Sequence, residues 1–508
     1  MIRTPRIPAL ALCALCLAWA AAGPAAAQDA SKAMRVAVTF NSKWHRTPQT
    51  GSVYLIVTSD LIGEPRFELG SWDHTPWIFR KDVVNLAPGE EVVFDLGTPG
   101  FPGRLGQIPT GQYALQAIFD QSLDDPDFAH ADGNGRSRLR RHFLDATSGS
   151  VIPLEIERDM TRPHRVDLAR VRYRSIESRL VGRALGRRYY CDVAVLLPPG
   201  YTALAKEGRK FPVQYWIPGN GVRARGALKF FQERRIYFAG SDPEMDTEPF
   251  IRVILDAQGP NGHHYWTDSD ANGPMGSALF EEVIPALEEE FAIRKDPASR
   301  FLVGHGAGGL AAISILLRRP ADFAGVYALA PDPLDFRSFF GLDLEKADGL
   351  DAFTAADGSP RPFVVRDGRA VVTLKDQARY EEIVHRGGIL RSLETSFAKR
   401  GRERLFDRVT GRVDPKVARD FLEHDPRRIV ARNAASLGPK IDKKIHLAVG
   451  DKDDFRLTEP TISFVQELRG IGIRVRLDTI IGAGHRDLDS AKVHALVQDD
   501  ISKNWRER

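Results

Sequence analysis

Cysteine is scarce in this sequence. Only three of its 508 residues are cysteines, and two of these, Cys13 and Cys16, lie within the first 27 residues. If that segment is removed, Cys191 remains alone and an intrachain disulfide is excluded, so the folded chain depends on its apolar cores. Cys191 lies in the apolar run 189–197, where a packed thiol is favoured over a nucleophile.

The sequence also lacks a marked excess of charge of either sign. Lys and Arg exceed Asp and Glu by four, and loss of Arg3 and Arg6 with the first 27 residues leaves an excess of two. A chain so close to neutral has no strong electrostatic attraction for nucleic acid, which we therefore do not expect as a partner.

Long uncharged runs are missing everywhere except near the N-terminus. There, Arg3 and Arg6 precede an apolar run over residues 7–22, which is followed by Ala25-Ala26-Ala27. This order predicts a secretory signal peptide over residues 1–27. A membrane anchor is the less favoured alternative, because the run is short for a bilayer and no stop-transfer pattern follows. We expect a periplasmic or secreted protein that is not inserted in the membrane after cleavage.

Residues 34–158 show short alternating strand patterns between turns. The turn sequences at 87–89 and 109–111 each precede a predicted strand, and no helical periodicity intervenes. The pattern favours an all-β, immunoglobulin-like sandwich domain. Examples of the predicted strands are Arg35 to Phe40, Val53 to Thr58, Glu91 to Leu96, Gln112 to Phe119 and Val151 to Glu157.

One loop of this domain, residues 124–135, is rich in Asp, Asn and Gly. Asp127, Asp132 and Asn134 are oxygen donors of the kind that calcium prefers, but the spacing fits no EF-hand loop and the bidentate glutamate is missing. The same residue types are typical of a solvated loop, which is the favoured interpretation. We expect no metal and no cofactor.

From residue 165 to residue 508, strand patterns alternate with helical ones, which is typical of a mostly parallel sheet with helices on both faces. Residues 162–174 are interpreted as a linker or a first edge strand. Residues 331–439 are a charged insertion without clear strands, with a predicted helix from Gln377 to Arg400, and are interpreted as a cap over the site. The predicted strands are 189–197, 211–217, 251–255, 301–303, 325–329, 445–449 and 475–481, and the other predicted helices are 278–291, 309–319, 459–469 and 491–498.

The sequence RFLVGHGAGG at residues 300–309 combines an apolar run with a glycine-rich corner and opens a helical pattern. A strand, a sharp turn and a helix in this order are the setting of the nucleophile elbow G-x-S-x-G. The middle residue here is Gly306, which has no atom with which to attack a carbonyl. Glycine adopts the strained backbone of such a corner without the cost that serine incurs, so we expect the fold to persist.

Two further polar residues follow strands in the order that an α/β-hydrolase triad requires. Asp453, with Asp454 as the alternative, comes just after the strand 445–449, and His485 follows the next strand. Together with the elbow, this order predicts an α/β-hydrolase fold and a site built from Gly306, Asp453 and His485.

The backbone N–H groups for an oxyanion hole are expected from Ala307 and from Gly219 or Asn220, in a glycine-containing loop after an early strand. A simple tight turn is the alternative for that loop. His305 is expected to point away from the site and to pack or form a structural hydrogen bond.

Several blocks of the sequence resemble the esterase D-like branch of the α/β-hydrolases, secreted or periplasmic esterases in which a β-sandwich precedes the hydrolase domain. The most specific block contains Gly262-His263-His264. The family elbow has the form G-H-S-x-G-G, which implies a serine where this chain has Gly306. The resemblance therefore implies the fold of a carboxylic ester hydrolase, with its activity lost or strongly reduced in this chain. The blocks are 195–201, 212–219, 255–264, 268–274 and 330–336.

Four aromatic residues in or near these blocks, Trp216, His263, His264 and Trp266, are expected to line a substrate pocket, with packing as the alternative. The expected ligand is a small ester, peptide or glycoside. The sequence gives no indication of the oligomeric state.

Three functions remain open from the sequence. In the first, the chain is an esterase-like protein without acyl-enzyme chemistry. It binds a ligand in the pocket where an active esterase would bind its substrate. In the second, it is an active ester hydrolase that uses water activated by His485, or a non-standard nucleophile such as Ser269, Ser277 or Ser314. In the third, it is an extracellular interaction module in which the sandwich binds and the hydrolase domain is a scaffold.

Overall fold

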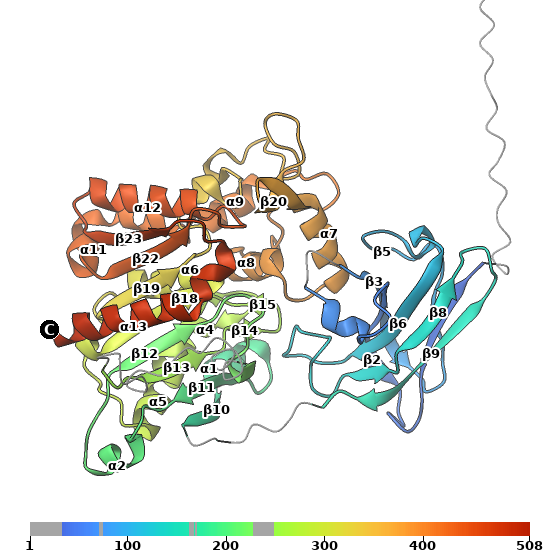
Figure 1. The fold of residues 1–508 in the computed structure, drawn as a ribbon, viewed down its shortest axis with the longest axis horizontal. Coiled ribbons are helices and arrows are strands. Elements are labelled where there is room, and N and C mark those ends of the chain that lie inside the picture. The colour runs from blue at the N-terminus through green and yellow to red at the C-terminus, as the bar shows by residue number, and fades with distance from the viewer. Residues whose placement is uncertain (1–32, 71–74, 162–166, 168–169, 227–247, 508) are drawn as a thin grey trace, which may run out of the picture.

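The computed structural model describes residues 33–70, 75–161, 167, 170–226 and 248–507. The predicted signal peptide lies outside these residues. Figure 1 shows a β domain, drawn in blue and teal, beside a larger domain in which helices surround a second sheet. Within the described chain, no helix has the length and apolar character needed to cross a membrane.

The N-terminal domain is one nine-stranded sheet wrapped around its own apolar core. The strand order is β4-β1-β9-β7-β6-β2-β3-β5, β8 also pairs with β6, and every pair is antiparallel except β1 with β9. Alternate residues such as Val36, Val38 and Phe40 are buried in the core. The strands are β1 (Arg35–Phe40), β2 (Gln49–Thr58), β3 (Trp77–Leu86), β4 (Val92–Phe94), β5 (Gly100–Phe101), β6 (Gly111–Asp120), β7 (Gly135–Ser137), β8 (Arg140–Leu144) and β9 (Val151–Asp159).

Four of these strands, β3, β5, β7 and β8, are not among the strands predicted from the sequence. In β3 the charged residues Arg80, Lys81 and Asp82 interrupt the apolar pattern. The structure pairs β3 with β2, buries Ile78 and Phe79, and leaves the later part of the strand largely exposed. Pairing with a regular neighbour therefore forms this strand despite its mixed sequence.

The second sheet has the order β10-β11-β13-β12-β18-β19-β22-β23, and its strands are parallel from β13 to β23. β10 is an antiparallel edge strand. Cys191 lies on β11 and is buried, and burial raises the pKa of its thiol. The strands are β10 (Val171–Glu177), β11 (Tyr190–Leu196), β12 (Val213–Ile217), β13 (Ile251–Leu255), β18 (Arg300–His305), β19 (Gly325–Leu329), β22 (Ile445–Gly450) and β23 (Val475–Ile480).

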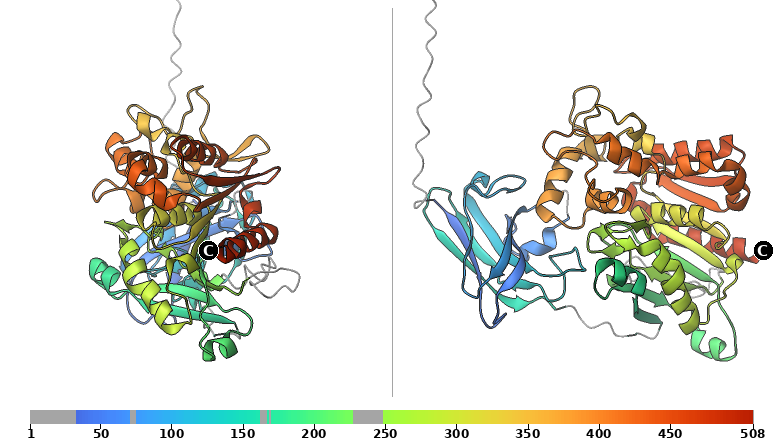
Figure 2. Two further views of the ribbon diagram at one scale, coloured as in Figure 1. Left: turned by 90° about the vertical axis from the view of Figure 1, so that its left-hand side faces the viewer. Right: turned by 180° about the vertical axis from the view of Figure 1, so that it is seen from behind.

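Helices cover both faces of this sheet, which confirms the predicted architecture (Figure 2). On one face, α13 contributes Val493, Val497 and Ile501 to a core with Trp216 and Phe301. The other face is covered by apolar side chains of other helices, among them α5, α6 and α12. The helices are α1 (Arg179–Leu185), α2 (Tyr201–Lys206), α4 (Met275–Ala278), α5 (Ile284–Glu290), α6 (Ala307–Arg318), α12 (Thr458–Gly470) and α13 (Ala491–Arg506), with one π-helical turn (Leu279–Val283) between α4 and α5.

The long insertion between β19 and β22 differs from its prediction. The predicted single helix from Gln377 to Arg400 is wrong, because Gly387 and Gly388 have φ of +74° and +84° and separate α7 (Leu374–Val384) from α8 (Ile389–Phe397). The insertion also contains a two-stranded hairpin, β20 (Pro362–Arg366) with β21 (Arg369–Thr373). Its other helices are α9 (Pro415–Leu422), α10 (Pro426–Arg432) and α11 (Ala434–Ile441).

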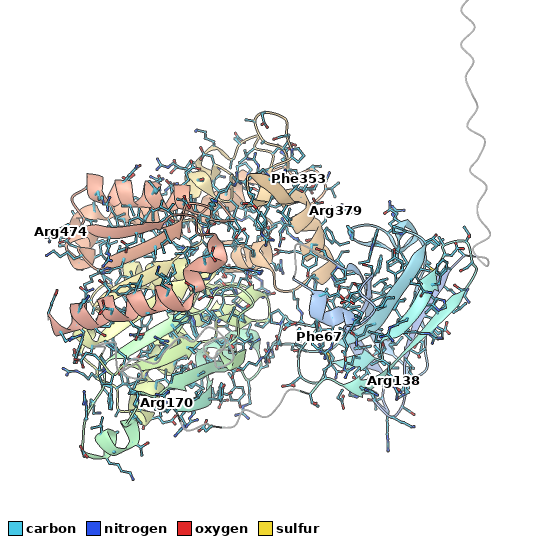
Figure 3. The ribbon with its side chains drawn as sticks, viewed as in Figure 1. Phe67, Arg138, Arg170, Phe353, Arg379 and Arg474 are labelled. Carbon is cyan, nitrogen blue, oxygen red and sulfur yellow. The ribbon has the colours of Figure 1, made fainter. Side chains whose placement is uncertain are left out.

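Helix α7 of the insertion packs against the β domain. Tyr54 donates a hydrogen bond to the carbonyl oxygen of Val384 at 2.9 Å, and the rings of Phe101 and Tyr380 are 5.5 Å apart. Arg379, labelled in Figure 3 at this junction, donates to the carbonyl oxygen of Pro102 at 2.8 Å. The β domain therefore contacts the insertion of the larger domain.

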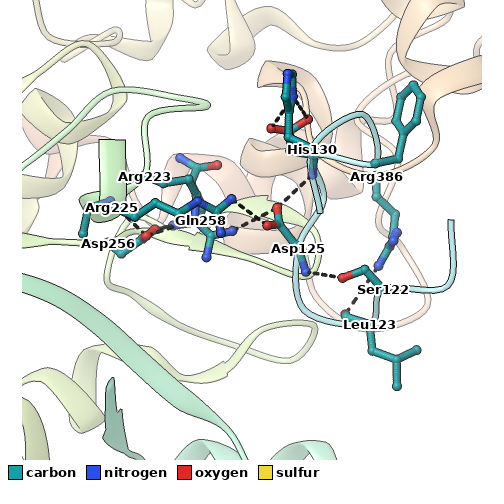
Figure 4. A network of polar contacts seen from close by, with 12 residues as sticks. Ser122, Leu123, Asp125, His130, Arg223, Arg225, Asp256, Gln258 and Arg386 are labelled. Atoms are coloured by element: carbon teal, nitrogen blue, oxygen red, sulfur yellow. Dashed lines mark hydrogen bonds and ion pairs between the residues drawn. The ribbon is translucent and has the colours of Figure 1, made fainter. Parts of the chain in front are cut away.

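The Asp-rich loop of the β domain makes a second contact with the larger domain (Figure 4). Asp125 forms ion pairs with Arg223 at 3.1 Å and Arg225 at 2.7 Å, and Arg223 continues the network to Asp256 at 2.9 Å. In the same loop, Asp127 pairs with His130. No group of three or more His, Cys, Asp or Glu side chains in the described residues is arranged to hold a metal ion. The loop thus contributes charged side chains to the contact between the two domains.

Candidate active site

The glycine-rich corner connects β18 to α6. Gly306 has φ +55° and ψ −121°, donates its N–H to the carbonyl oxygen of Leu329 at 3.0 Å, and accepts from Gly309 N–H at 2.9 Å. Positive φ of this kind costs an L-residue about 1–3 kcal/mol, whereas glycine adopts it freely. The corner therefore has the strained backbone geometry of an elbow, occupied by the residue that tolerates it best.

The other glycines of the corner are required by close packing. A Cβ atom on Gly308 would lie 1.9 Å from the carbonyl oxygen of Ile217, and one on Gly304 would lie 2.1 Å from the carbonyl oxygen of Gly308. The start of α6 thus lies directly against the end of β12, where the loop with Gly219 begins.

Replacing Gly308 with alanine should lower the free energy of unfolding by about 3 kcal/mol, because the added methyl group overlaps backbone atoms that cannot move freely. The control is Gly470→Ala at the end of α12, where an added Cβ meets no atom within 4 Å and φ is not positive. Denaturant unfolding of both variants measures the difference. Equal stability of the two variants would contradict the close packing of the corner.

His485 and Asp453 meet at the carboxyl edge of the parallel strands. The Nδ1 atom of His485 lies 2.9 Å from Oδ2 of Asp453, whose Oδ1 accepts from the backbone N–H groups of Phe455 and Leu457 at 2.9 and 3.2 Å. Asp454 does not contact the ring, since its Oδ2 accepts from the backbone N–H of His485 and its Oδ1 pairs with Arg366. Asp453 is therefore the carboxylate that orients the imidazole.

The second ring nitrogen of His485 faces the corner. A Cβ atom built on Gly306 would lie 3.3 Å from Nε2 of His485, so a side chain at position 306 would point at this nitrogen. Burial alone lowers the pKa of His485, but its hydrogen bond to Asp453 and the negative charges of Asp453, Asp332 and Asp454 outweigh burial and raise the pKa above its ordinary value. The imidazole is held in one orientation with Nε2 directed at residue 306.

His305 lies behind this site. Its Nε2 donates to the carbonyl oxygen of His485 at 3.1 Å, the two rings are 4.6 Å apart, and burial lowers the pKa of His305 to about 4. The ring is therefore a neutral support for the loop that carries His485.

The loop with Gly219 and Asn220 is held by hydrogen bonds to two other segments of the chain. Buried His263 donates from Nε2 to the carbonyl oxygen of Pro218 at 3.1 Å, and the side-chain amide of Asn220 donates to the carbonyl oxygen of Gly388 in the insertion at 3.1 Å. Neither Gly219 nor Asn220 donates its backbone N–H within the described chain. Both N–H groups, like that of Ala307 at the first position of α6, are available to a ligand oxygen.

The family described as Putative esterase matches residues 183–470, which is more than half of the chain and includes Gly306 and Asp453. The chain belongs to this esterase family. The match ends before His485, whose contact with Asp453 is seen only in the structure.

Solved structures with similar folds include esterases and other serine hydrolases. A ferulic acid esterase matches at 14% identity over 66% of this chain and 98% of that chain, with a TM-score of 0.42. The fluorophosphonate-binding serine hydrolase FphF of Staphylococcus aureus matches at 14% identity over 66% and 99%, with a TM-score of 0.39. An S-formylglutathione hydrolase from Agrobacterium tumefaciens matches at 15% identity over 66% and 95%, also with a TM-score of 0.39. No curated protein matches the chain.

The four aromatic residues expected to line a substrate pocket, with packing as the alternative, are buried in the structure. Each side chain is at most 3% exposed. Trp216 stacks on His494 under α13, on the opposite face of the sheet from α6. The Nδ1 atoms of His263 and His264 accept from the backbone N–H groups of Tyr265 and Trp266, and burial lowers the pKa of both histidines. These residues build the framework of the site.

The serines considered as substitute nucleophiles are held by other contacts. Ser277 donates to Asp268 at 2.8 Å, Ser269 accepts from the N–H of Asn272, and Ser314 lies on α6 beyond the corner. In the described chain, none of the polar or ring contacts of His485 is to a serine.

One residue beside Gly306 is not among the candidates identified from the sequence. Asp332, in the loop after β19, donates its N–H to the carbonyl oxygen of Gly306 at 3.0 Å and accepts from the hydroxyl of Tyr265 at Oδ2, also at 3.0 Å. Its Oδ1 would lie 4.0 Å from a Cβ atom on Gly306. The only sequence signal for Asp332 is its place in the block 330–336, which carries the family resemblance.

The backbone is strained two residues before Asp332 and also at Tyr265, its hydrogen-bond partner. Ala330 has φ +39°, and Tyr265 and Trp266 have φ of +52° and +46°. Each such residue costs about 1–3 kcal/mol and is typical of segments that hold a functional group in place. The chain thus retains strained geometry around a site that lacks a nucleophile at its elbow.

Proposed function

We propose that this chain is an exported member of the esterase family that has lost acyl-enzyme chemistry, with carboxylic ester hydrolysis abolished or strongly reduced. The observation that supports it is the 3.3 Å separation between His485 Nε2 and a Cβ atom built on Gly306. A serine at this position would be directed at the imidazole, and glycine offers no oxygen to attack a carbonyl carbon. The 2.9 Å contact between His485 and Asp453 beside this position supports the proposal that only the nucleophile is missing.

The retained N–H groups suggest what the site binds. The backbone N–H groups of Ala307 and of Gly219 or Asn220 favour a carbonyl oxygen as ligand, so the proposed ligand is a small ester, peptide or glycoside with an acyl group. Export is proposed from the signal-peptide pattern of residues 1–27.

A second candidate, slow hydrolysis by water without an acyl-enzyme, is favoured by Asp332. This buried carboxyl group faces the same side of the elbow as His485 Nε2. Removal of triad members from serine proteases leaves about 10³–10⁴-fold rate enhancement over water, so a serine-free site of this kind retains measurable catalysis.

A fluorophosphonate probe should form no covalent adduct with the chain from Gln28 onward. The reason is that the probe reacts with an activated serine, which position 306 lacks. The measurement is the intact mass of the treated protein. The same chain after heat denaturation controls for non-specific reaction. Stoichiometric labelling of the native chain, or hydrolysis of p-nitrophenyl acetate at an ordinary enzyme turnover of about 10 per second, would contradict the proposal.

A further inference from the structure

Two titratable side chains converge on one point in front of the elbow. A Cβ atom built on Gly306 would lie 3.3 Å from Nε2 of His485 and 4.0 Å from Oδ1 of Asp332. Each of these atoms has no hydrogen-bond partner within the described chain, whereas the other polar atom of each group is engaged. The two groups therefore flank the space that a serine side chain would occupy.

Asp332 is held as firmly as His485. Its backbone N–H donates to the carbonyl oxygen of Gly306, and its Oδ2 accepts from the hydroxyl of buried Tyr265. Tyr265 itself has a strained φ of +52° and packs its ring against Phe397 of α8 at 5.2 Å. One carboxyl oxygen is fixed by these contacts, and the other is directed at the point that Nε2 also faces.

We propose that Asp332 is a catalytic residue, the general base for a water molecule that attacks an ester carbonyl directly, with the imidazolium of His485 as the general acid. This inference rests on the proposed function, since it applies to an elbow without a nucleophile. It assigns to Asp332 a role that a serine-dependent route does not need.

The reaction balances without any further reagent. Oδ1 of Asp332 takes a proton from water as the water oxygen forms a bond to the carbonyl carbon, and the oxyanion is held by the N–H groups of Ala307 and of Gly219 or Asn220. The carbon–oxygen bond to the leaving group then breaks, and the leaving alkoxide takes the Nε2 proton of His485. Transfer of the proton from Asp332 to His485 restores both groups, so an ester and water give a carboxylic acid and an alcohol.

The directions of the two pKa shifts support these roles. Burial raises the pKa of Asp332 to about 6; the charge of Asp453 acts in the same direction, and His485 and Tyr265 oppose it. Three carboxylates, Asp453, Asp332 and Asp454, keep the pKa of His485 above its ordinary value despite burial. A carboxylate base beside an imidazolium acid is therefore the favoured pair between the two pKa values.

The pH dependence distinguishes this route from one in which neutral His485 is the base. With Asp332 as the base, activity is lost as pH falls through about 6, because Asp332 takes up a proton. Activity is also lost as pH rises through the pKa of His485, because the acid loses its proton. A neutral histidine base would instead give a rate that rises with pH to a plateau.

The test is hydrolysis of methyl butyrate by the chain from Gln28 onward, measured as methanol released between pH 4 and pH 9. An alkyl ester is used because its alkoxide leaving group requires a proton. The native chain should give a bell-shaped profile, and Asp332→Asn should lower the rate at the optimum about 10²-fold. Asp348→Asn, the same change at an exposed aspartate, should leave the rate unchanged.

A second variant keeps the proposal testable if Asp332→Asn is poorly folded. Tyr265→Phe removes the hydrogen bond that lowers the pKa of Asp332, so the acidic limb of the profile should move to higher pH. A residue that only supports the fold would change the rate without moving this limb.

Four outcomes would overturn the inference: an Asp332→Asn rate equal to that of the native chain, a profile that rises to a plateau, a Tyr265→Phe profile with an unmoved acidic limb, or no hydrolysis above the buffer blank. None of these contradicts the loss of acyl-enzyme chemistry. Covalent labelling of the native chain by the fluorophosphonate would instead contradict the proposed function itself.

Discussion

Replacing Gly306 with serine should increase hydrolysis of p-nitrophenyl acetate by about 10²–10³-fold and make the chain react with a fluorophosphonate. The serine Cβ would lie 3.3 Å from Nε2 of His485, whose orientation is fixed by Asp453. In serine proteases the triad as a unit contributes about 10⁶-fold to kcat. The expected gain is smaller, because His485 must move by a few tenths of an ångström to accept the new side chain.

The same substitution should lower the free energy of unfolding by about 1–3 kcal/mol, because serine must adopt φ +55° at the corner. Gly306→Ala is the matched control, since it adds the same Cβ atom and the same backbone strain without a hydroxyl group. The two variants should lose similar stability in thermal unfolding, but only the serine variant should gain activity and labelling. Equal hydrolysis rates for serine and alanine would refute the assignment of the corner as an elbow.

In the Gly306→Ser background, Asp453→Asn should reduce kcat by about 10²–10³-fold, back to the level of the chain without the serine, while leaving the fold intact. An asparagine in place of Asp453 cannot stabilise the imidazolium, and its amide favours the wrong tautomer of His485. The measurement is kcat for p-nitrophenyl acetate, with circular dichroism to verify folding.

Asp454→Asn in the same background is the matched control. Asp454 is the next residue in the chain and touches the backbone N–H of His485, but it makes no contact with the imidazole ring. Its substitution should reduce kcat by less than about tenfold. A larger loss from Asp454→Asn than from Asp453→Asn would reverse the assignment of the acid.

Much of the fold follows from local patterns. Five strands of the second sheet, β12, β13, β18, β19 and β22, produce short apolar runs, because these parallel strands are buried on both faces and so contain few polar residues. Strand β3 lacks this signal, since Arg80, Lys81 and Asp82 lie on a strand formed by pairing with β2. The break between α7 and α8 depends on the positive φ of Gly387 and Gly388, which an amphipathic pattern does not reveal.

The order of residues along the chain predicts three members of the candidate site. Gly306, Asp453 and His485 each follow a parallel strand, and the carboxyl ends of such strands meet at one edge. The aromatic residues Trp216 and Trp266 carry no sequence signal that separates a pocket wall from a buried core position. Asp332 also follows a parallel strand, but its nearness to Gly306 depends on the path of the loop after β19, which chain order does not encode.

Cys191 is buried on β11 between β10 and β13, so the reactivity of its thiol reports how often this part of the sheet opens. It is the single thiol from Gln28 onward, and a protected thiol reacts with an aromatic disulfide reagent only when the surrounding strands separate. The rate of that reaction in native buffer therefore measures how often this part of the sheet opens, without an added label. Comparing the native chain with the Gly306 variants would show whether strain at the elbow spreads across the sheet or stays at the corner.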